Sequence, residues 1–292
     1  MKYSRRKMIK GVAAAAGAMA VSTPLLSNCA TTKSVSTALK GNINHSVCRW
    51  CFDSIPLEEF CESVKEIGIK SIELTTPEEW KILQKYGLAC AIGTGSFVNL
   101  TDGFNDTAYH EKLYKPYLEL ISKAADNGVP NVILLTGNKR GISDEEGIEN
   151  FAVGADKLVK HAEKVGVTLI MEMFNTKVDH AGYHADSTKF GVKLVDKIGS
   201  PNFKLLYDIY HMQIMEGDII RTITDYKDYI AHYHTAGVPG RHEIDETQEL
   251  NYRGIMQAIV NNGFNGYVAQ EFIPIREDKI ATLREAVHIC DV

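Results

Sequence analysis

The chain has 292 residues, of which 45% are hydrophobic and 24% charged, and its formal net charge is −5. This is the composition of an ordinary globular protein, with enough apolar residues to bury one large core or two small ones. The negative charge makes the chain a poor candidate for binding nucleic acid, because such binding depends on neutralising phosphates with cations.

Residues 1–29 are predicted to be an export signal rather than part of the folded domain. Arg5 and Arg6 precede a short apolar stretch rich in alanine and glycine, a pattern that resembles a twin-arginine signal. The stretch is too short to span a bilayer comfortably. Removing these residues takes away five cations and no anion, so the formal net charge changes from −5 to −10.

The signal ends in Leu26-Ser27-Asn28-Cys29, which resembles the cleavage site of a lipoprotein, although Asn28 stands where a small residue is usual. We expect Cys29 to be acylated and to act as a lipid anchor. The alternative is simple cleavage nearby and release into the periplasm. Residues 30–41 are small and polar and predict a flexible linker. The sequence therefore predicts export by the twin-arginine route, to a periplasmic or membrane-anchored location.

Five cysteines follow Cys29, and two of them have the spacing Cys48-Arg-Trp-Cys51. A redox or metal role for this pair would need a helix N-terminus or a second cysteine pair, and the sequence has neither. We expect Cys48 and Cys51 to pack in the core or to form a local disulfide.

From residue 42 onward, short β-branched runs alternate with longer amphipathic stretches. The runs predict strands over 44–48, 71–75, 88–93, 131–137, 168–174, 203–209, 230–237 and 267–272. Among the stretches between them, four predict helices that end near a glycine: 56–69, 109–128, 147–166 and 251–263. Eight alternating units predict a single-domain (β/α)8 TIM barrel over residues 42–292. A doubly wound sheet is the alternative, but no glycine-rich phosphate motif follows a predicted strand.

Polar residues interrupt the C-terminal ends of four successive predicted strands, which is where TIM barrels carry their active sites. These residues are Glu172, Asp208, His234 and Glu271. If their faces point into the barrel, the four side chains converge on one rim. Three carboxylates and an imidazole buried together need a neutralising cation. The pattern predicts one divalent metal ion, Mn²⁺ or Mg²⁺, with Zn²⁺, Co²⁺ or Fe²⁺ as alternatives.

Two further histidines lie close to this predicted rim. His232 shares a face with His234, and we expect it one layer deeper, either orienting a neighbour or serving as a core histidine with one hydrogen bond. His211 follows Asp208 by three residues. We expect it to point over the rim and to hydrogen-bond a hydroxyl or carbonyl group of a substrate.

Three segments, "IMEMFNTKVDHAGYH", "LYDIYHMQIMEGD" and "TAGVPGRHEIDETQELNY", resemble those of the hydroxypyruvate isomerase family. This family lies within the sugar isomerases and epimerases that have a xylose isomerase-like barrel. The resemblance runs through most of residues 44–290. It implies that the four strand-end residues bind the metal, and that Arg241 pairs with a substrate carboxylate or an enediolate oxygen. At the position of His234 the hydroxypyruvate isomerases carry Gln. The ketose epimerases carry His there, as this chain does, so the substrate stays open.

The resemblance implies an isomerase or epimerase of an α-hydroxy carbonyl compound, such as hydroxypyruvate, a keto-sugar or a sugar acid. Isomerisation removes a proton from one carbon and returns one to its neighbour through a cis-enediolate, and epimerisation returns it to the same carbon on the other face; the metal stabilises the charge of the enediolate. We expect Glu172 and Glu271 to act as base and acid, because their strands lie three apart around the rim. A homodimer is a further expectation, since barrels of this group often dimerise.

Two other functions stay open. A sugar-binding lipoprotein without catalysis would use the same barrel. A phosphodiesterase of the apurinic endonuclease type would need more histidine ligands and a basic surface, which a net charge of −10 opposes. No catalytic role is assigned to a group of weaker candidates near the strand ends: Trp50, Phe52, Glu73, Asn175, Lys177, His180 and Tyr183.

Overall fold

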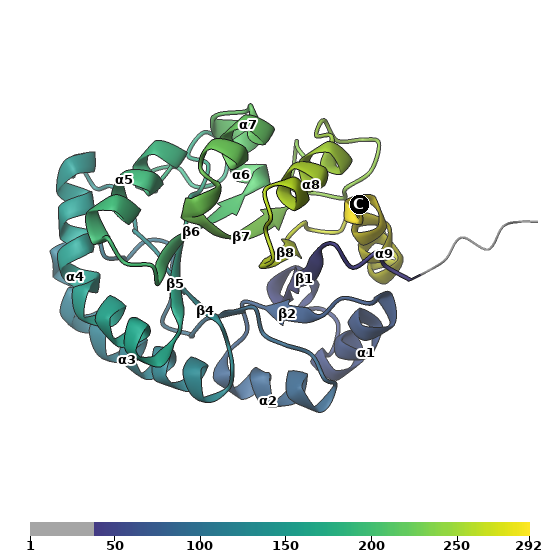
Figure 1. Ribbon diagram of the computed structural model, residues 1–292, viewed down its shortest axis with the longest axis horizontal. Helices are drawn as coiled ribbons and strands as arrows, with labels where there is room; N and C mark the ends of the chain where they lie inside the picture. Colours follow the sequence, from purple (N-terminus) through teal and green to yellow (C-terminus); the bar gives the residue numbers. More distant parts are fainter. Residues whose placement is uncertain (1–37) are drawn as a thin grey trace, which may run out of the picture. The chain divides into compact units, whose positions relative to one another are not determined.

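The computed structural model describes residues 38–292, which form a ring of strands surrounded by helices (Figure 1). The predicted signal over residues 1–29, the predicted lipid anchor at Cys29 and most of the predicted linker lie outside the described residues. Within the described part, strands and helices alternate along the chain. The predicted single-domain (β/α)8 barrel is confirmed.

Eight parallel strands form the wall of the barrel in the order β2-β1-β8-β7-β6-β5-β4-β3. The ring closes where β3 meets β2, because Ile72 N donates to Ala89 O at 3.1 Å and Leu74 N donates to Ile92 O at 2.8 Å. A closed ring excludes the doubly wound sheet. The strands are β1 (Asn44–Cys48), β2 (Ser71–Glu73), β3 (Ile92–Gly93), β4 (Asn131–Leu134), β5 (Thr168–Glu172), β6 (Phe203–Asp208), β7 (Ile230–Thr235) and β8 (Tyr267–Gln270).

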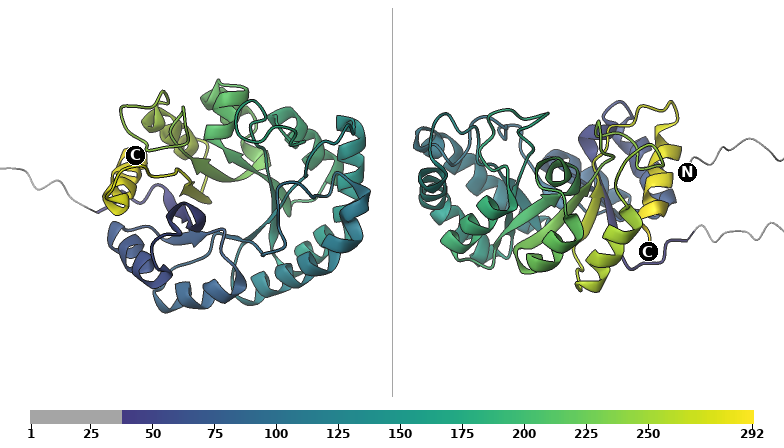
Figure 2. Two further views of the ribbon diagram at one scale, coloured as in Figure 1. Left: turned by 180° about the vertical axis from the view of Figure 1, so that it is seen from behind. Right: turned by 90° about the horizontal axis from the view of Figure 1, so that it is seen from above.

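Helices lie outside the ring of strands and cover its apolar outer face (Figures 1 and 2). They are α1 (Leu57–Ile67), α2 (Pro77–Lys85), α3 (His110–Asp126), α4 (Asp144–Val165), α5 (Thr188–Ile198), α6 (Ile209–Met215), α7 (Ile219–Asp225), α8 (Tyr252–Asn261) and α9 (Lys279–Cys290). Helix α4 begins at the Ser143 side chain, which accepts from Glu146 N, and ends at Gly166, which has a φ of 77°. The serine cap and the left-handed glycine explain why this helix begins and ends where it does.

Most strands end earlier than predicted. The run 88–93 forms only the two-residue strand β3, where Gly93 passes so close to Trp80 that a side chain at residue 93 would collide with the indole ring. Strand β6 ends at Asp208, whose carboxylate accepts from Tyr210 N at 2.8 Å and caps helix α6. The chain therefore leaves the sheet at the same rim that carries the predicted ligands.

The first described residues pack on the barrel. Leu39, within the predicted linker, contacts the hydrophobic core, and Lys40 N donates to Asp291 Oδ2 at 2.9 Å. The five cysteines of the described part are all buried and free, so Cys48 and Cys51 pack in the core and form no local disulfide. No helix among residues 38–292 is both long and apolar enough to cross a membrane.

Candidate active site and metal centre

Four predicted ligands meet at one rim of the barrel. Glu172 is the last residue of β5 and Asp208 the last residue of β6, while His234 is the last residue but one of β7 and Glu271 directly follows β8. Each side chain is buried, and one ligand atom from each lies within 4.8 Å of the others. The closure of the ring therefore brings together residues that are up to 99 positions apart in the sequence.

The contacts within this group leave one carboxylate oxygen without a partner. His234 Nδ1 is hydrogen-bonded to Glu271 Oε2 at 2.7 Å and lies 3.6 Å from Glu172 Oε1. That Glu172 oxygen is buried and has no hydrogen-bond partner in the described part. A buried carboxylate oxygen without a partner is costly unless a cation satisfies it.

The protonation of the carboxylates reflects their crowding. Burial and the charge of Glu271 raise the pKa of Glu172 to about 8, and burial raises the pKa of Asp208 to about 6 although Arg241 opposes the shift. Burial also acts on Glu271, but His234 and Arg241 hold its pKa well below the usual range. The protein side chains alone therefore do not compensate three negative charges at this rim.

The donor set fits a divalent cation. Carboxylate oxygens with one imidazole nitrogen suit Mn²⁺ or Mg²⁺, and Zn²⁺, Co²⁺ or Fe²⁺ accept the same ligands. Glu172, Asp208 and Glu271 would supply the oxygens, and His234 would supply Nδ1, which faces them. The unpartnered oxygen of Glu172 is the observation that supports this fit.

Arg241 contacts two of the carboxylates, and its pairing with a substrate stays a prediction. Its Nη2 contacts Asp208 Oδ2 at 3.1 Å and Glu271 Oε2 at 2.5 Å. The guanidinium carbon lies 5.3 Å from the ring centroids of both Trp50 and Tyr210, so two aromatic rings hold it in place. Its backbone has a φ of 60°, a left-handed conformation that few residues other than glycine adopt.

A cavity of about 510 Å³ opens at the C-terminal ends of the strands, beside the carboxylates. Glu172, Glu271, Arg241 and His180 are among its lining residues and form what is called its charged end below. Apolar side chains, called the apolar wall below, come mainly from β4 and the segments that follow β2 to β5: Leu74, Val98, Leu100, Ile133, Leu135 and Phe174. The cavity thus offers both charged groups, where chemistry can occur, and apolar surface that can cover the rest of a ligand.

His211 occupies a deeper position than we expected. Its imidazole is fully buried, with Nδ1 2.7 Å from the Asn175 amide nitrogen and Nε2 3.4 Å from Asp208 Oδ2. It is not among the residues that line the cavity, whereas His180, whose ring centroid lies 5.2 Å away, is one of them. The reason is that α6 begins directly after Asp208 and turns His211 toward Asn175. Substrate binding by His211 stays a prediction.

Two residues to which the sequence analysis assigns no role contact the predicted ligands. Trp50 Nε1 donates to Glu271 Oε1 at 2.8 Å, and Glu73 Oε1 lies 2.8 Å from His234 Nε2. Glu73 is the last residue of β2, so the strand-end rule that selects Glu172 and Asp208 also selects Glu73. Trp50 lies in the short 3-10 helix after β1. In the sequence, the only signal of a polar role for Trp50 is that its ring nitrogen can donate a hydrogen bond.

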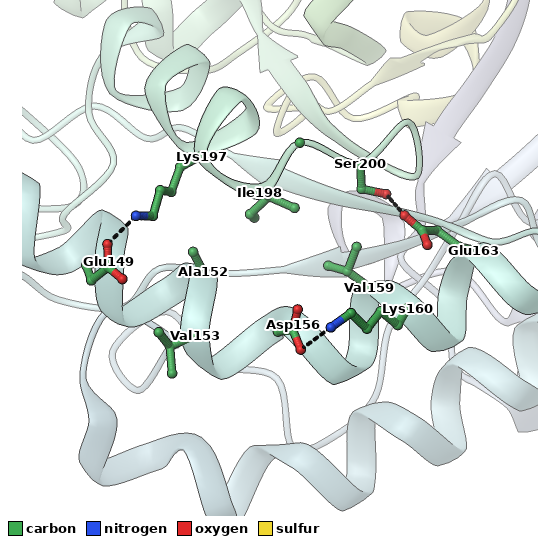
Figure 3. A pocket seen from close by; sticks show the side chains of 11 residues that line it. Glu149, Ala152, Val153, Asp156, Val159, Lys160, Glu163, Lys197, Ile198 and Ser200 are labelled. Carbon is green, nitrogen blue, oxygen red and sulfur yellow. Dashed lines mark hydrogen bonds and ion pairs between the residues drawn. The ribbon is translucent and has the colours of Figure 1, made fainter.

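A second hollow, of about 470 Å³, lies on the outer surface between α4 and α5 (Figure 3). Its charged side chains form ion pairs with one another or a hydrogen bond with a hydroxyl group: Lys197 pairs with Glu149, Lys160 with Asp156, and Ser200 donates to Glu163. The groove is far from the strand ends that carry the carboxylates. It is a seam between helices rather than a reaction site.

Comparison with known proteins shows that the chain is similar to one family of TIM barrels. The family described as "Xylose isomerase-like TIM barrel" matches residues 61–288. Hydroxypyruvate isomerase of Escherichia coli is 38% identical over 127 residues, which cover 44% of this chain and 47% of the relative, about half its length. A putative hydroxypyruvate isomerase of Homo sapiens is 25% identical over 235 residues, which cover 77% of each chain.

Solved structures share the fold at low sequence identity. An AP endonuclease of family 2 from Brucella melitensis has a TM-score of 0.73 and 22% identity, and the match covers 82% of this chain and 97% of that one. The 3-keto-D-glucoside 4-epimerase of E. coli has a TM-score of 0.70 and 18% identity, with 84% and 98% covered. At such identities the likeness concerns the fold alone.

Proposed function

Because this chain belongs to the xylose isomerase-like TIM barrel family, we propose that it is a metal-dependent isomerase or epimerase of an α-hydroxy carbonyl compound. The observation that carries the proposal is the convergence of Glu172, Asp208, His234 and Glu271 on one buried rim beside a cavity. Relatives named hydroxypyruvate isomerase and 2-oxo-tetronate isomerase support an isomerase. The ketose and keto-glucoside epimerases among the solved structures share only the fold.

The reaction in this proposal is a proton transfer through a cis-enediolate. A bound divalent cation supplies polarisation of the carbonyl group and stabilises the negative charge that develops on its oxygen. Glu172 and Glu271 border the cavity from strands β5 and β8 and serve as base and acid. Arg241 borders the cavity beside them and holds an enediolate oxygen or a carboxylate of the substrate.

The cavity favours a substrate larger than hydroxypyruvate. A three-carbon keto acid is polar throughout and would leave most of the apolar wall, including Leu135 and Phe174, without a partner. Among the described residues that line the cavity, Arg241 is the only lysine or arginine, and it also pairs with Asp208 and Glu271. We therefore favour a keto-sugar, or a sugar acid, that reacts at the charged end and packs a less polar face on the wall.

Location and assembly belong to the same proposal. Twin-arginine export carries folded proteins, so the protein would acquire its metal before it meets competing cations outside the cytoplasm. A lipid anchor at Cys29 and a homodimer remain proposals from the sequence. The substrate would then be a sugar that the protein meets outside the cytoplasm.

A phosphodiesterase of the apurinic endonuclease type is a weaker candidate. Among residues 38–292, every group of His, Cys, Asp and Glu close enough to hold a metal ion includes His234. A cluster of several metals would need more ligands than one such group supplies, and the three groups of the described residues overlap at this one histidine. The formal net charge of −5 also opposes binding to DNA.

Solvent-deuterium exchange tests the proposed function. The full chain, loaded with Mn²⁺ during preparation, is incubated in deuterated water with hydroxypyruvate, free ketoses and keto-sugar acids. After the paramagnetic metal is removed, NMR reads the products, and we expect deuterium at a carbon next to the carbonyl group of at least one substrate. Metal-loaded protein that binds these compounds and exchanges none of their protons would be a sugar-binding protein instead.

A further inference from the structure

A buried carboxylate contacts the proposed imidazole ligand at the ring nitrogen that faces away from the other proposed ligands. Glu73, at the end of β2, is fully buried. Its Oε1 is hydrogen-bonded to His234 Nε2 at 2.8 Å. The same oxygen lies 2.8 Å from His232 Nε2. Strand β2 is three strands away from β7 in the ring, so the contact crosses the interior of the barrel.

The orientation of the His234 ring gives this contact a chemical meaning. Nδ1 faces Glu271 and Glu172, at 2.7 and 3.6 Å, while Nε2 faces Glu73. A neutral imidazole that binds a metal through Nδ1 must carry its hydrogen on Nε2. That hydrogen then points at the Glu73 carboxylate. Carboxylates in this position behind a ligating histidine fix the tautomer and the ring orientation.

We propose that Glu73 is a positioning residue of the metal centre, which holds His234 through Nε2 so that Nδ1 is presented to the cation. His232 Nε2 lies 2.8 Å from the same carboxylate oxygen, although it makes no hydrogen bond within the described part. The inference rests on the proposed metal dependence and adds a residue outside the proposed set of four ligands.

A purely structural role explains Glu73 poorly. A fully buried carboxylate costs several kcal/mol of desolvation, and an apolar residue would fill the same space without that cost. The hydrogen bonds and ion pairs of Glu73 in the described part involve His232, His234 and the thiol of Cys48, with no lysine or arginine among them. Its second oxygen, Oε2, has no hydrogen-bond partner in the described part. The carboxylate is thus directed at imidazole nitrogens, which is the arrangement that orients a ligand.

Glu73, His232 and His234 also lie close enough to suggest a second metal ion. Such an ion would need His234 Nε2 as a ligand, and the proposed tautomer carries hydrogen on that atom. The two arrangements therefore differ in the number of ions that the chain binds and in the tautomer of His234.

The direct test compares Mn²⁺ binding to the full-length wild-type chain and to Glu73→Gln by titration calorimetry. Glutamine keeps the size of the side chain but removes its charge, so we expect the dissociation constant to rise about 10- to 100-fold with one ion still bound per chain. Glu216→Gln is the matched control. Its carboxylate accepts from the backbone nitrogen and the hydroxyl group of Thr188 and contacts none of the proposed ligands, so we expect affinity within about twofold of wild type.

A measurement on the wild-type chain covers the case in which Glu73→Gln does not fold. With ¹⁵N-labelled histidine and diamagnetic Zn²⁺, NMR distinguishes a metal-bound from a protonated ring nitrogen. We expect His234, assigned by its loss in His234→Gln, to carry hydrogen on Nε2 and the metal on Nδ1. The reverse tautomer would overturn the inference.

The outcomes separate this inference from the proposed function. Wild-type protein that binds no divalent cation would refute the proposed function and the inference together. Wild-type protein that binds one ion, with Glu73→Gln binding it equally well or Glu216→Gln weakening it just as much, would refute only the role of Glu73. Two ions per wild-type chain, reduced to one in Glu73→Gln, would make Glu73 a ligand and overturn the positioning role.

Discussion

The indole nitrogen of Trp50 donates a 2.8 Å hydrogen bond to Oε1 of Glu271, so a residue that follows β1 fixes a carboxylate that follows β8. Trp50 is 40% exposed and lines the cavity. Its ring also faces the guanidinium group of Arg241. One aromatic side chain therefore contacts both a proposed catalytic carboxylate and a proposed substrate-binding cation.

Trp50→Phe is expected to lower turnover without unfolding the protein. Phenylalanine keeps an aromatic face toward Arg241 but cannot donate to Glu271. A hydrogen bond to a charged group contributes about 1.5 to 3 kcal/mol, which corresponds to roughly 10- to 100-fold in kcat/KM. Deuterium exchange on the accepted substrate and a thermal unfolding curve check this, and an unchanged rate would mean that Glu271 does not need the indole.

Glu172→Gln and Glu271→Gln are each expected to reduce proton transfer by about 10²- to 10⁴-fold at saturating metal, the usual contribution of a general acid or base. Glu216→Gln is the control. Glu216 directly follows α6, and its carboxylate binds Thr188, the first residue of α5, away from the cavity. Rates are compared at Mn²⁺ concentrations that saturate each variant. Near-normal exchange by either active-site variant would rule out the two-carboxylate mechanism.

The sequence predicts much of this site because strand periodicity and barrel closure act together. Side chains alternate along a strand, and parallel strands end at one rim. A polar residue at the end of an otherwise apolar strand therefore predicts a polar side chain at that rim. That reasoning selects Glu172, Asp208, His234 and Glu271, which the structure brings together.

The remaining features depend on contacts that no local pattern encodes. The strand-end rule selects Glu73, but not its contact with His234 across 161 positions of the sequence. Arg241 reaches the carboxylates because its loop adopts a left-handed φ of 60°, a conformation that arginine seldom adopts. The direction of His211 depends on α6 beginning one residue after Asp208, which moves its side chain from the rim to a buried position.

Removal of the metal is expected to destabilise the fold. A cation that binds only the native state, at 100 times its dissociation constant, adds about 2.7 kcal/mol to the free energy of unfolding. Chemical unfolding of the full chain in Mn²⁺ and in EDTA measures this difference. In Asp208→Asn the difference should shrink, because one ligand is weakened, and an equal difference in both proteins would place the cation elsewhere.

Protonation of His45 is expected to destabilise the protein at acidic pH. His45 lies in β1 with 1% of its surface exposed, and neither ring nitrogen has a hydrogen-bond partner in the described part. Burial lowers its pKa to about 4, although Asp291, 3.8 Å away, opposes the shift. The unfolded chain takes up this proton near pH 6.5 and the folded chain only near pH 4, so between these values a falling pH favours unfolding.

The expected loss is about 3 kcal/mol between pH 7 and pH 4, the free-energy equivalent of the difference between the two pKa values. His45→Gln isolates it, because the other titrating groups are common to both proteins. The free energy of unfolding of wild type minus that of the variant should fall by this amount across the window. A level difference for His45→Gln would mean that the buried imidazole gains a proton without cost, with Asp291 compensating its charge fully.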